Sequence, residues 1–162
     1  MKNRRLLNRI LKGVYKPDTM CQLAVDGVYH YIMVDSCAIY RIKALENPFS
    51  ADKAFKPIKL NRISGFLKKE EPVALTGGEI TYTTADKKTW TRFDDKDGHP
   101  ILVNAEYVKC LPKEYQQSMY RNGKLVVSID DKGNIVAVIA PLRDKSTQII
   151  IGNKKPLSPP AK

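Results

Sequence analysis

The chain of 162 residues has few of the side chains that most often form cross-links or hold metals: three cysteines and two histidines. Cys21, Cys37 and Cys110 are odd in number and widely spaced, and no two of them form a Cys-x-x-Cys pair. This pattern argues against a disulfide framework and predicts reduced, structural thiols. Neither His30 nor His99 has a partner at metal-ligand spacing, so we expect no metal site.

Motifs that carry catalysis are also missing. The sequence has no phosphate cradle of the form Gly-x-x-x-x-Gly-Lys-Ser/Thr or Gly-x-Gly-x-x-Gly, and no Gly-x-Ser-x-Gly turn. A calcium loop beginning at Asp94 would need Glu at its twelfth position, where Ala105 stands. The acidic cluster from Asp94 to Gly98 therefore indicates a turn. We expect no enzyme and no cofactor.

Long apolar runs are absent, and acidic residues are under-represented. No run approaches the roughly twenty apolar residues that cross a bilayer, and no signal-peptide core follows the basic N-terminus. We therefore expect a cytoplasmic protein without a membrane partner. Lys and Arg number 28 against 17 Asp and Glu, which gives a net charge of +11. Such an excess favours polyanionic partners, because neutralising phosphates releases condensed counterions.

The first predicted element is an amphipathic helix over residues 3–15. Its apolar positions follow a period of 3.6 residues: Leu6, Leu7, Ile10, Leu11 and Val14. Its basic positions share the opposite stripe: Arg5, Arg9, Lys12 and Lys16. Like charges at this spacing disfavour an isolated helix by a few tenths of a kcal/mol. The stripe has three interpretations, namely a solvated face, a phosphate-facing surface and a helix lying on a membrane surface.

Strands are predicted on both sides of a second helix. Residues 22–26 and 28–34 form a hairpin across Asp26-Gly27, and Asp35-Ser36 turns the chain into a strand at 38–43. Further strands are expected at 72–75, 79–84, 89–93, 101–103, 125–129, 135–140 and 147–151. The helix begins at Asn104, a capping residue, and Pro112 either breaks or kinks it or starts a second short helix.

These elements predict an α+β fold, mainly antiparallel sheet with two helices, in a single domain over residues 1–151. Residues 152–162 contain three prolines and two adjacent lysines, which predict a flexible tail. The basic, proline-punctuated segment 46–69 is expected to be a solvated loop, with an extension of a nucleic-acid face as the alternative.

Two short sequence motifs in the second half of the chain resemble motifs of a known protein family. The strand that ends Ile139-Ala140-Pro141-Leu142-Arg143 lies about thirty residues after Val103-Asn104-Ala105-Glu106-Tyr107-Val108. Together they are similar to the last strand and second helix of a domain of the bacterial DNA polymerase sliding clamp (beta subunit). That strand closes with an apolar residue, Pro, an apolar residue and Arg. The helix, hairpin, turn and strand of residues 6–43 are similar to the first half of such a domain.

The resemblance implies a single DNA-clamp-like domain. Clamps carry three domains per subunit, and two subunits close a ring whose helices touch DNA phosphates without reading bases. It implies phosphate contacts by these residues: Arg5, Arg9, Lys12, Lys109 and Lys113. Lys16, the last residue of the basic stripe, is expected to join them. The resemblance also implies a groove for client peptides, bordered by Ala140, Pro141, Leu142 and Arg143. The chain departs from the family in holding one domain only and in continuing for nineteen residues past Arg143.

The sequence therefore predicts a non-catalytic DNA-binding accessory of replication that contacts phosphates through a basic helix face. Its expected partners are duplex DNA, replication proteins and further copies of itself in a homo-oligomer. The alternative is a protein-interaction module, encoded by a phage or mobile element, that regulates a host protein without binding DNA.

Overall fold

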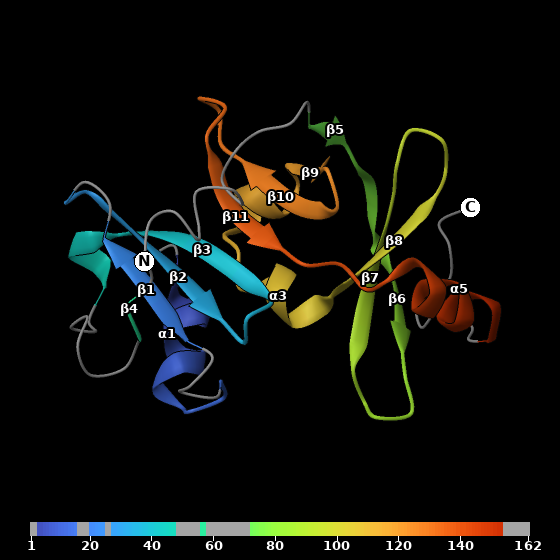
Figure 1. Ribbon diagram of the computed structural model, residues 1–162, viewed down its shortest axis with the longest axis horizontal. Coiled ribbons are helices and arrows are strands. Elements are labelled where there is room, and N and C mark those ends of the chain that lie inside the picture. The colour runs from blue at the N-terminus through green and yellow to red at the C-terminus, as the bar shows by residue number, and fades with distance from the viewer. Residues whose placement is uncertain (1–2, 16–19, 25–26, 48–55, 58–71, 154–162) are drawn as a thin grey trace.

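The computed structural model describes residues 3–15, 20–24, 27–47, 56–57 and 72–153, which form two sheets and several short helices (Figure 1). The larger sheet has eight strands in the order β4-β1-β2-β3-β11-β10-β9-β5, and the smaller has the order β6-β7-β8. The pairings are antiparallel except for that of β1 with β4. The predicted α+β class with mainly antiparallel sheet is confirmed.

The strands of the larger sheet are β1 (Cys21–Ala24), β2 (Tyr29–Val34), β3 (Ala38–Lys43), β4 (Lys56–Pro57), β5 (Val73–Ala74), β9 (Met119–Asn122), β10 (Leu125–Ile129) and β11 (Ile135–Ile139). The smaller sheet consists of β6 (Thr76–Thr83), β7 (Thr89–Asp94) and β8 (Pro100–Asn104). The helices are α1 (Arg4–Leu11), α3 (Ala105–Lys109), α4 (Lys113–Gln116) and α5 (Asp144–Asn153), with a 3-10 turn, η2 (Ala44–Glu46). None of these described helices has the length and apolar character needed to span a bilayer.

Six of the eight strands of the larger sheet form two similar halves, and β4 and β5 lie at its two edges. In each half a helical segment precedes an antiparallel meander of three strands: α1 precedes β1-β2-β3, and α3 with α4 precedes β9-β10-β11. The halves meet where β3 pairs antiparallel with β11, in the register Tyr40↔Ala137 and Ala38↔Ile139. In Figure 1 the blue-to-cyan half and the orange half lie side by side along this pairing.

The predicted hairpins form for local reasons. β1 and β2 pair antiparallel in the register Leu23↔Tyr31, and the left-handed φ of Gly27 is +74°. Between β2 and β3, Asp35 and Ser36 both have positive φ, of 56° and 53°. They are the central residues of a β-turn closed by the Cys37 amide, which donates to the Val34 carbonyl at 3.1 Å. Two positive φ angles in such a turn match the right-handed twist of the strands on either side.

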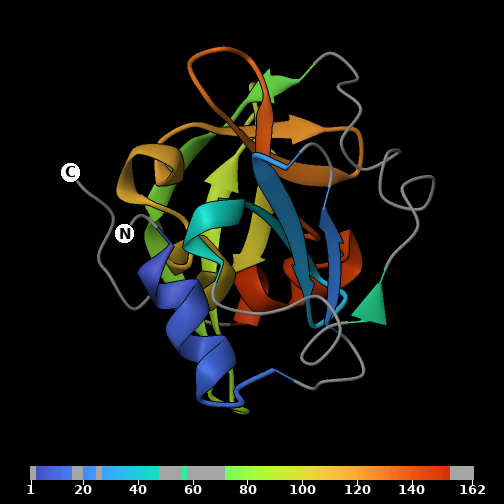
Figure 2. The same ribbon diagram turned by 90° about the vertical axis from the view of Figure 1, so that its left-hand side faces the viewer.

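A single large core joins α1 and α3 to both sheets. Leu6, Leu7 and Ile10 of α1 are buried in one cluster with Tyr40 of β3 and Val103 of β8. Figure 2 shows α1 (blue) and α4 (gold) on the same side of β1 and β2. β11 is buried at every position, because the helices cover one of its faces and a second apolar cluster lies on the other.

The first helix is shorter than predicted. It ends at Leu11, and Gly13 leaves the helix with a left-handed φ of +67°. Leu11 and Val14, both expected on the buried stripe, are 67% and 48% exposed. The periodic pattern runs past the glycine, but Gly13 redirects the chain before the next turn forms.

The prediction of two helices is also wrong. Pro112 separates α3 from α4, as its missing amide hydrogen requires. The strand predicted at 147–151 is instead part of α5, which packs against β8. The helix continues to Asn153, so the predicted domain boundary at 151 falls inside it. Residues 154–162 and most of the segment 46–69 lie outside the described residues.

The chain crosses between the sheets directly after β11. The Ala140 amide donates to the carbonyl of Cys37, in the β2–β3 turn, at 2.8 Å. Two residues later the Leu142 amide donates to the carbonyl of Leu102, in β8, also at 2.8 Å. The segment from Ala140 to Leu142 therefore ties the larger sheet to the smaller one.

Candidate nucleic-acid interface

Helix α1 presents its basic side to solvent. Arg4, Arg5 and Lys12 are exposed, and Arg9 is partly buried. An open hollow of about 520 Å³ is lined by Arg4, Arg5, Asn8, Arg9, Lys12 and Val14. The lining combines four cations with an amide and an apolar side chain, a composition that suits a polyanion. Lys16, the last member of the predicted stripe, lies outside the described residues.

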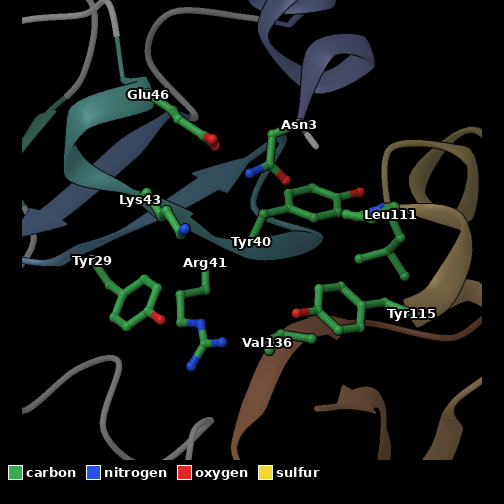
Figure 3. A pocket seen from close by; sticks show the side chains of 10 residues that line it. Asn3, Tyr29, Tyr40, Arg41, Lys43, Glu46, Leu111, Tyr115 and Val136 are labelled. Atoms are coloured by element: carbon green, nitrogen blue, oxygen red, sulfur yellow. The ribbon is translucent and has the colours of Figure 1, made fainter. Parts of the chain in front are cut away.

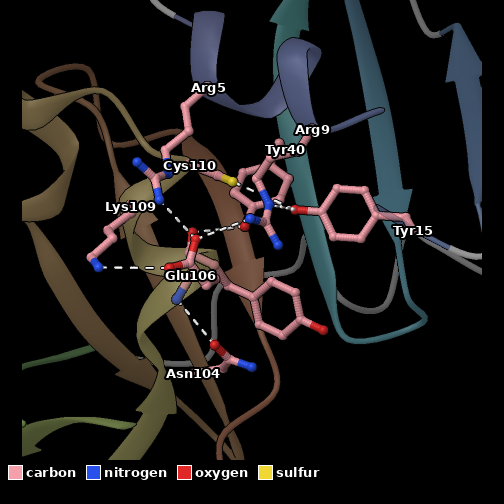
Figure 4. A network of polar contacts seen from close by, with 9 residues as sticks. Arg5, Arg9, Tyr15, Tyr40, Asn104, Glu106, Lys109 and Cys110 are labelled. Atoms are coloured by element: carbon pink, nitrogen blue, oxygen red, sulfur yellow. Dashed lines mark hydrogen bonds and ion pairs between the residues drawn. The ribbon is translucent and has the colours of Figure 1, made fainter. Parts of the chain in front are cut away.

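Three of the predicted phosphate contacts converge on one carboxylate, that of Glu106 in α3 (Figure 4). Arg5 Nη2 donates to Glu106 Oε2 at 2.8 Å, and Arg9 Nη1 donates to the same oxygen at 3.1 Å. Lys109 Nζ lies 3.6 Å from Glu106 Oε1. The cluster of three cations and one carboxylate retains two positive charges.

Sequence reasoning did not single out Glu106. It lies about one hundred positions from Arg5, so local spacing gives no signal of this contact. The neighbouring cap was predictable, because Asn104 Oδ1 accepts the Glu106 amide hydrogen at 3.0 Å. That bond fixes the backbone from which the Glu106 side chain reaches α1.

The surrounding cations keep Glu106 ionised. The hydrogen bond from Arg5 lowers the pKa of the Glu106 carboxyl, and the charges of Arg5, Arg9 and Lys109 add to this effect against partial burial. Each exposed ion pair contributes only about 0–1 kcal/mol to stability. The cluster therefore fixes the arrangement of charge on this surface more than it stabilises the fold.

Arg9 is held more firmly than Arg5. Its Nε donates to the Tyr15 hydroxyl at 3.1 Å, and its guanidinium lies 5.3 Å from the centre of the Tyr15 ring. Tyr15 is itself buried beside Cys110, with Oη and Sγ 3.5 Å apart. Burial raises the pKa of the Tyr15 hydroxyl, so this group stays protonated. The Arg9 side chain is 25% exposed and that of Arg5 49%, so Arg5 is the more accessible of the two.

The other two predicted contacts on the second helix are exposed as well. Lys109 ends α3 and belongs to the Glu106 cluster. Lys113 begins α4, after the break at Pro112. Lys109 and Lys113 therefore lie on separate helical segments, in line with the expectation that Pro112 interrupts the helix.

The residues of the predicted peptide groove lie at two adjoining hollows. Pro141, Leu142 and Arg143 help to line one of about 360 Å³. Its other lining residues are Ile101, Arg121, Lys124, Leu125, Val126 and Asp144. Ala140 lines a smaller hollow of about 80 Å³ together with Cys37 and Leu125.

The β7–β8 turn groups Asp95, Asp97 and His99, whose candidate ligand atoms lie within 4.8 Å of one another. The Asp95 carboxylate accepts the backbone amide hydrogens of Asp97 and His99, both at 2.9 Å, and pairs with Arg121 at 3.6 Å. The His99 amide makes the largest contribution to lowering the pKa of Asp95. These bonds are those of a tight turn, so the predicted turn is enough to explain why Asp95, Asp97 and His99 lie close together.

Another hollow, between β3 and the segment leading to α4, has a volume of about 60 Å³ (Figure 3). Beside it, Arg41 pairs with Asp130 at 3.0 Å, and its guanidinium lies 4.2 Å from the centre of the Tyr29 ring. The volume corresponds to about two water molecules, which is too small for a nucleotide.

Comparisons with protein-family models, with curated proteins and with solved structures gave no match. Between the two candidate regions, the basic side of α1 is the larger opening and carries more cations than the hollow beside Arg143.

Proposed function

We propose that the chain is a non-catalytic DNA-binding protein that grips the phosphates of duplex DNA through α1 and the end of α3. The observation that supports this most is the clustering of Arg4, Arg5, Arg9 and Lys12 around one open hollow. Lys109 extends the positive surface from the adjoining helix. Only one carboxylate, that of Glu106, contacts this group of cations among the described residues.

The chemistry of the surface favours backbone contacts over base readout. Arg and Lys on a helix exterior neutralise phosphates, and such contacts orient a protein on a duplex without reading its sequence. The helices that carry these cations begin the two similar halves and share one core. A surface built from both halves suits a repeating polyanion, and it is consistent with a replication accessory that assembles from several copies.

The proposal predicts a defined salt dependence. For duplex DNA the logarithm of affinity falls with the logarithm of salt concentration, with a slope of about −0.9 for each phosphate contact. In the triple variant Arg5→Ala/Arg9→Ala/Lys12→Ala the slope should become less steep by about 2 to 3. Fluorescence anisotropy with a labelled duplex at four or more salt concentrations measures it.

A matched variant removes three exposed lysines elsewhere, Lys96→Ala/Lys132→Ala/Lys145→Ala. It loses the same charge and should keep the wild-type slope. Because Arg9 packs on Tyr15, a second triple variant, Arg4→Ala/Arg5→Ala/Lys12→Ala, spares that contact. An unchanged slope in both α1 variants would rule out this helix as the binding face.

One observation favours the second candidate function, a protein-interaction module. The hollow beside Arg143 combines the buried side chains of Ile101 and Val126 with exposed Lys124 and Arg143. Such a site suits a short peptide that places an apolar side chain next to a carboxylate. Lys124→Glu/Arg143→Glu would abolish capture of such a partner, and retention of the partner by this double variant would exclude the hollow.

A further inference from the structure

The Glu106 carboxylate lies at the meeting point of three cations on this surface. One of its oxygens accepts from two guanidinium groups, those of Arg5 and Arg9, and the other faces the Lys109 ammonium. Two helices that are distant in sequence supply these cations. An oxyanion held by several charge-assisted hydrogen bonds is the arrangement by which proteins also hold phosphate.

We propose that Arg5, Arg9 and Lys109 form an anion-binding site whose resident ligand is the Glu106 carboxylate, and that a phosphodiester of bound DNA displaces it. The inference rests on the proposed function, because it assigns to Glu106 the regulation of the same surface. The shared ligand chemistry is a phosphate oxyanion, which nucleic acid or free phosphate can supply.

The Glu106 carboxylate is placed so that exchange is easy. Its contacts within the described part of the chain are these three cations, and its side chain is 35% exposed. The Asn104 cap holds the Glu106 backbone and not its carboxylate, so rotation about side-chain bonds is enough to release it. Exposed ion pairs of this kind are individually weak.

The cations would stay in position after the exchange. Arg9 remains held by the Tyr15 hydroxyl and ring, and Tyr15 is anchored in the core beside Cys110. The side chains of Arg5 and Lys109 are 49% and 54% exposed, so both can reach an incoming phosphate. The site is therefore pre-organised at Arg9 and adaptable at its two other members.

The consequence is that Glu106 limits affinity for DNA. The variant Glu106→Gln keeps the size of the side chain and removes the competing charge. It should bind a short duplex about fivefold more tightly than wild type, since one charge contact at 4 Å in water is worth about that factor. Its salt slope should steepen by about one, because an additional phosphate contact becomes available.

The matched control is Glu79→Gln, an exposed position on β6 that makes the same change in net charge. It should change duplex affinity less than about twofold, because only a long-range, screened effect remains. If wild type binds DNA and the two Gln variants bind it equally, the inference is overturned while the proposed function stands.

Inorganic phosphate separates the two proposals. Glu106→Gln should bind phosphate, seen as chemical-shift changes of the Arg5 and Arg9 guanidinium signals that wild type and Glu79→Gln lack at the same concentration. Phosphate binding without any DNA binding would support the anion site and refute the proposed function. Absence of phosphate binding by a folded Glu106→Gln would overturn the anion site.

A measurement on wild type keeps the test independent of how the variant folds. The side-chain carboxyl carbon signal of Glu106 should shift when a short duplex is added, since its three cations exchange partners. A Glu106 signal that stays fixed while the DNA signals shift would also overturn the inference.

Discussion

At the scale of single residues, some buried hydroxyl groups have a hydrogen-bond partner and one has none among the described residues. The Tyr40 hydroxyl donates to the Tyr107 carbonyl at 2.7 Å, and Ser128 Oγ donates to the Tyr115 carbonyl at 2.8 Å. Thr147 in α5 is 1% exposed, and its Oγ1 has no hydrogen-bond partner among the described residues. A buried polar atom without a partner keeps its desolvation cost uncompensated.

This difference predicts opposite effects of removing the two small hydroxyls. Thr147→Val should stabilise the protein by about 1 kcal/mol, because the isosteric methyl group has no polar atom to desolvate. Ser128→Ala should destabilise it by about 1 kcal/mol, because the bond from Ser128 Oγ to the Tyr115 carbonyl is lost and only the Ser118 amide still donates to that carbonyl. Urea denaturation measures both, and a loss of stability in Thr147→Val would show that its hydroxyl is satisfied after all.

Residue roles were predictable where they depend on near neighbours in the sequence. Asn104 was identified as a cap because a cap bonds an amide two positions away. The basic positions of α1 followed from helical periodicity in the same way. Glu106 was missed because its partners on α1 are brought to it by the fold and not by spacing.

At the scale of elements, β6 depends on two glycines. Gly77 and Gly78 have φ angles of +100° and +98°, and the pairing of β6 with β7 slips between Gly77 and Thr81. A Cβ atom on Gly77 would lie 3.1 Å from the Arg92 carbonyl oxygen, which is backbone. A side chain at position 77 is therefore unfavourable, because the positive φ strains an L residue and because the Arg92 carbonyl leaves too little space.

Substitutions of alanine for glycine in β6 and in α5 should have opposite effects on the stability of the protein. Gly77→Ala should destabilise the protein by about 1–3 kcal/mol, because an L side chain is strained at that φ. Gly152→Ala in α5, where a Cβ meets nothing within 4 Å, should stabilise the helix by up to about 1 kcal/mol. Thermal denaturation of both variants tests the pair, and equal midpoints for the two would contradict the assignment of the bulge.

The elements themselves were predictable where turn residues mark their ends. The β1–β2 and β2–β3 hairpins followed from Asp26-Gly27 and Asp35-Ser36. Helix α5 was mistaken for a strand because its run of isoleucines has high intrinsic strand preference. Its burial is helical all the same: Ser146, Thr147, Ile150 and Ile151 are more buried than the residues between them. Packing on β8 decides this element, and packing is not a local property of the sequence.

At the scale of the whole molecule, two sheets share one core. Phe93 and Ile101 of the smaller sheet lie in the same buried cluster as Ile32 and Ile139 of the larger. Besides this shared core, backbone hydrogen bonds connect the sheets: the Ala140 amide donates to Cys37 beside the larger sheet, and the Leu142 amide donates to Leu102 in the smaller one. Such sharing makes independent unfolding of either sheet unfavourable, because each would expose the other's apolar face.

The only tryptophan tests this prediction, since Trp90 lies on β7 of the smaller sheet. Its fluorescence should change at the same denaturant concentration as far-UV circular dichroism, which reports on both sheets. An earlier change in Trp90 fluorescence would mean that the smaller sheet is a separate unit.

The central pairing of β3 with β11 has a consequence for synthesis of the protein. β3 leaves the ribosome roughly 5 to 20 seconds before β11 does, at ordinary rates of translation. During that interval the inner edge of the first meander has no neighbour, and its apolar residues are open to other nascent chains. Production of this protein should therefore depend strongly on chaperones, because a strand translated late, β11, completes the middle of its main sheet.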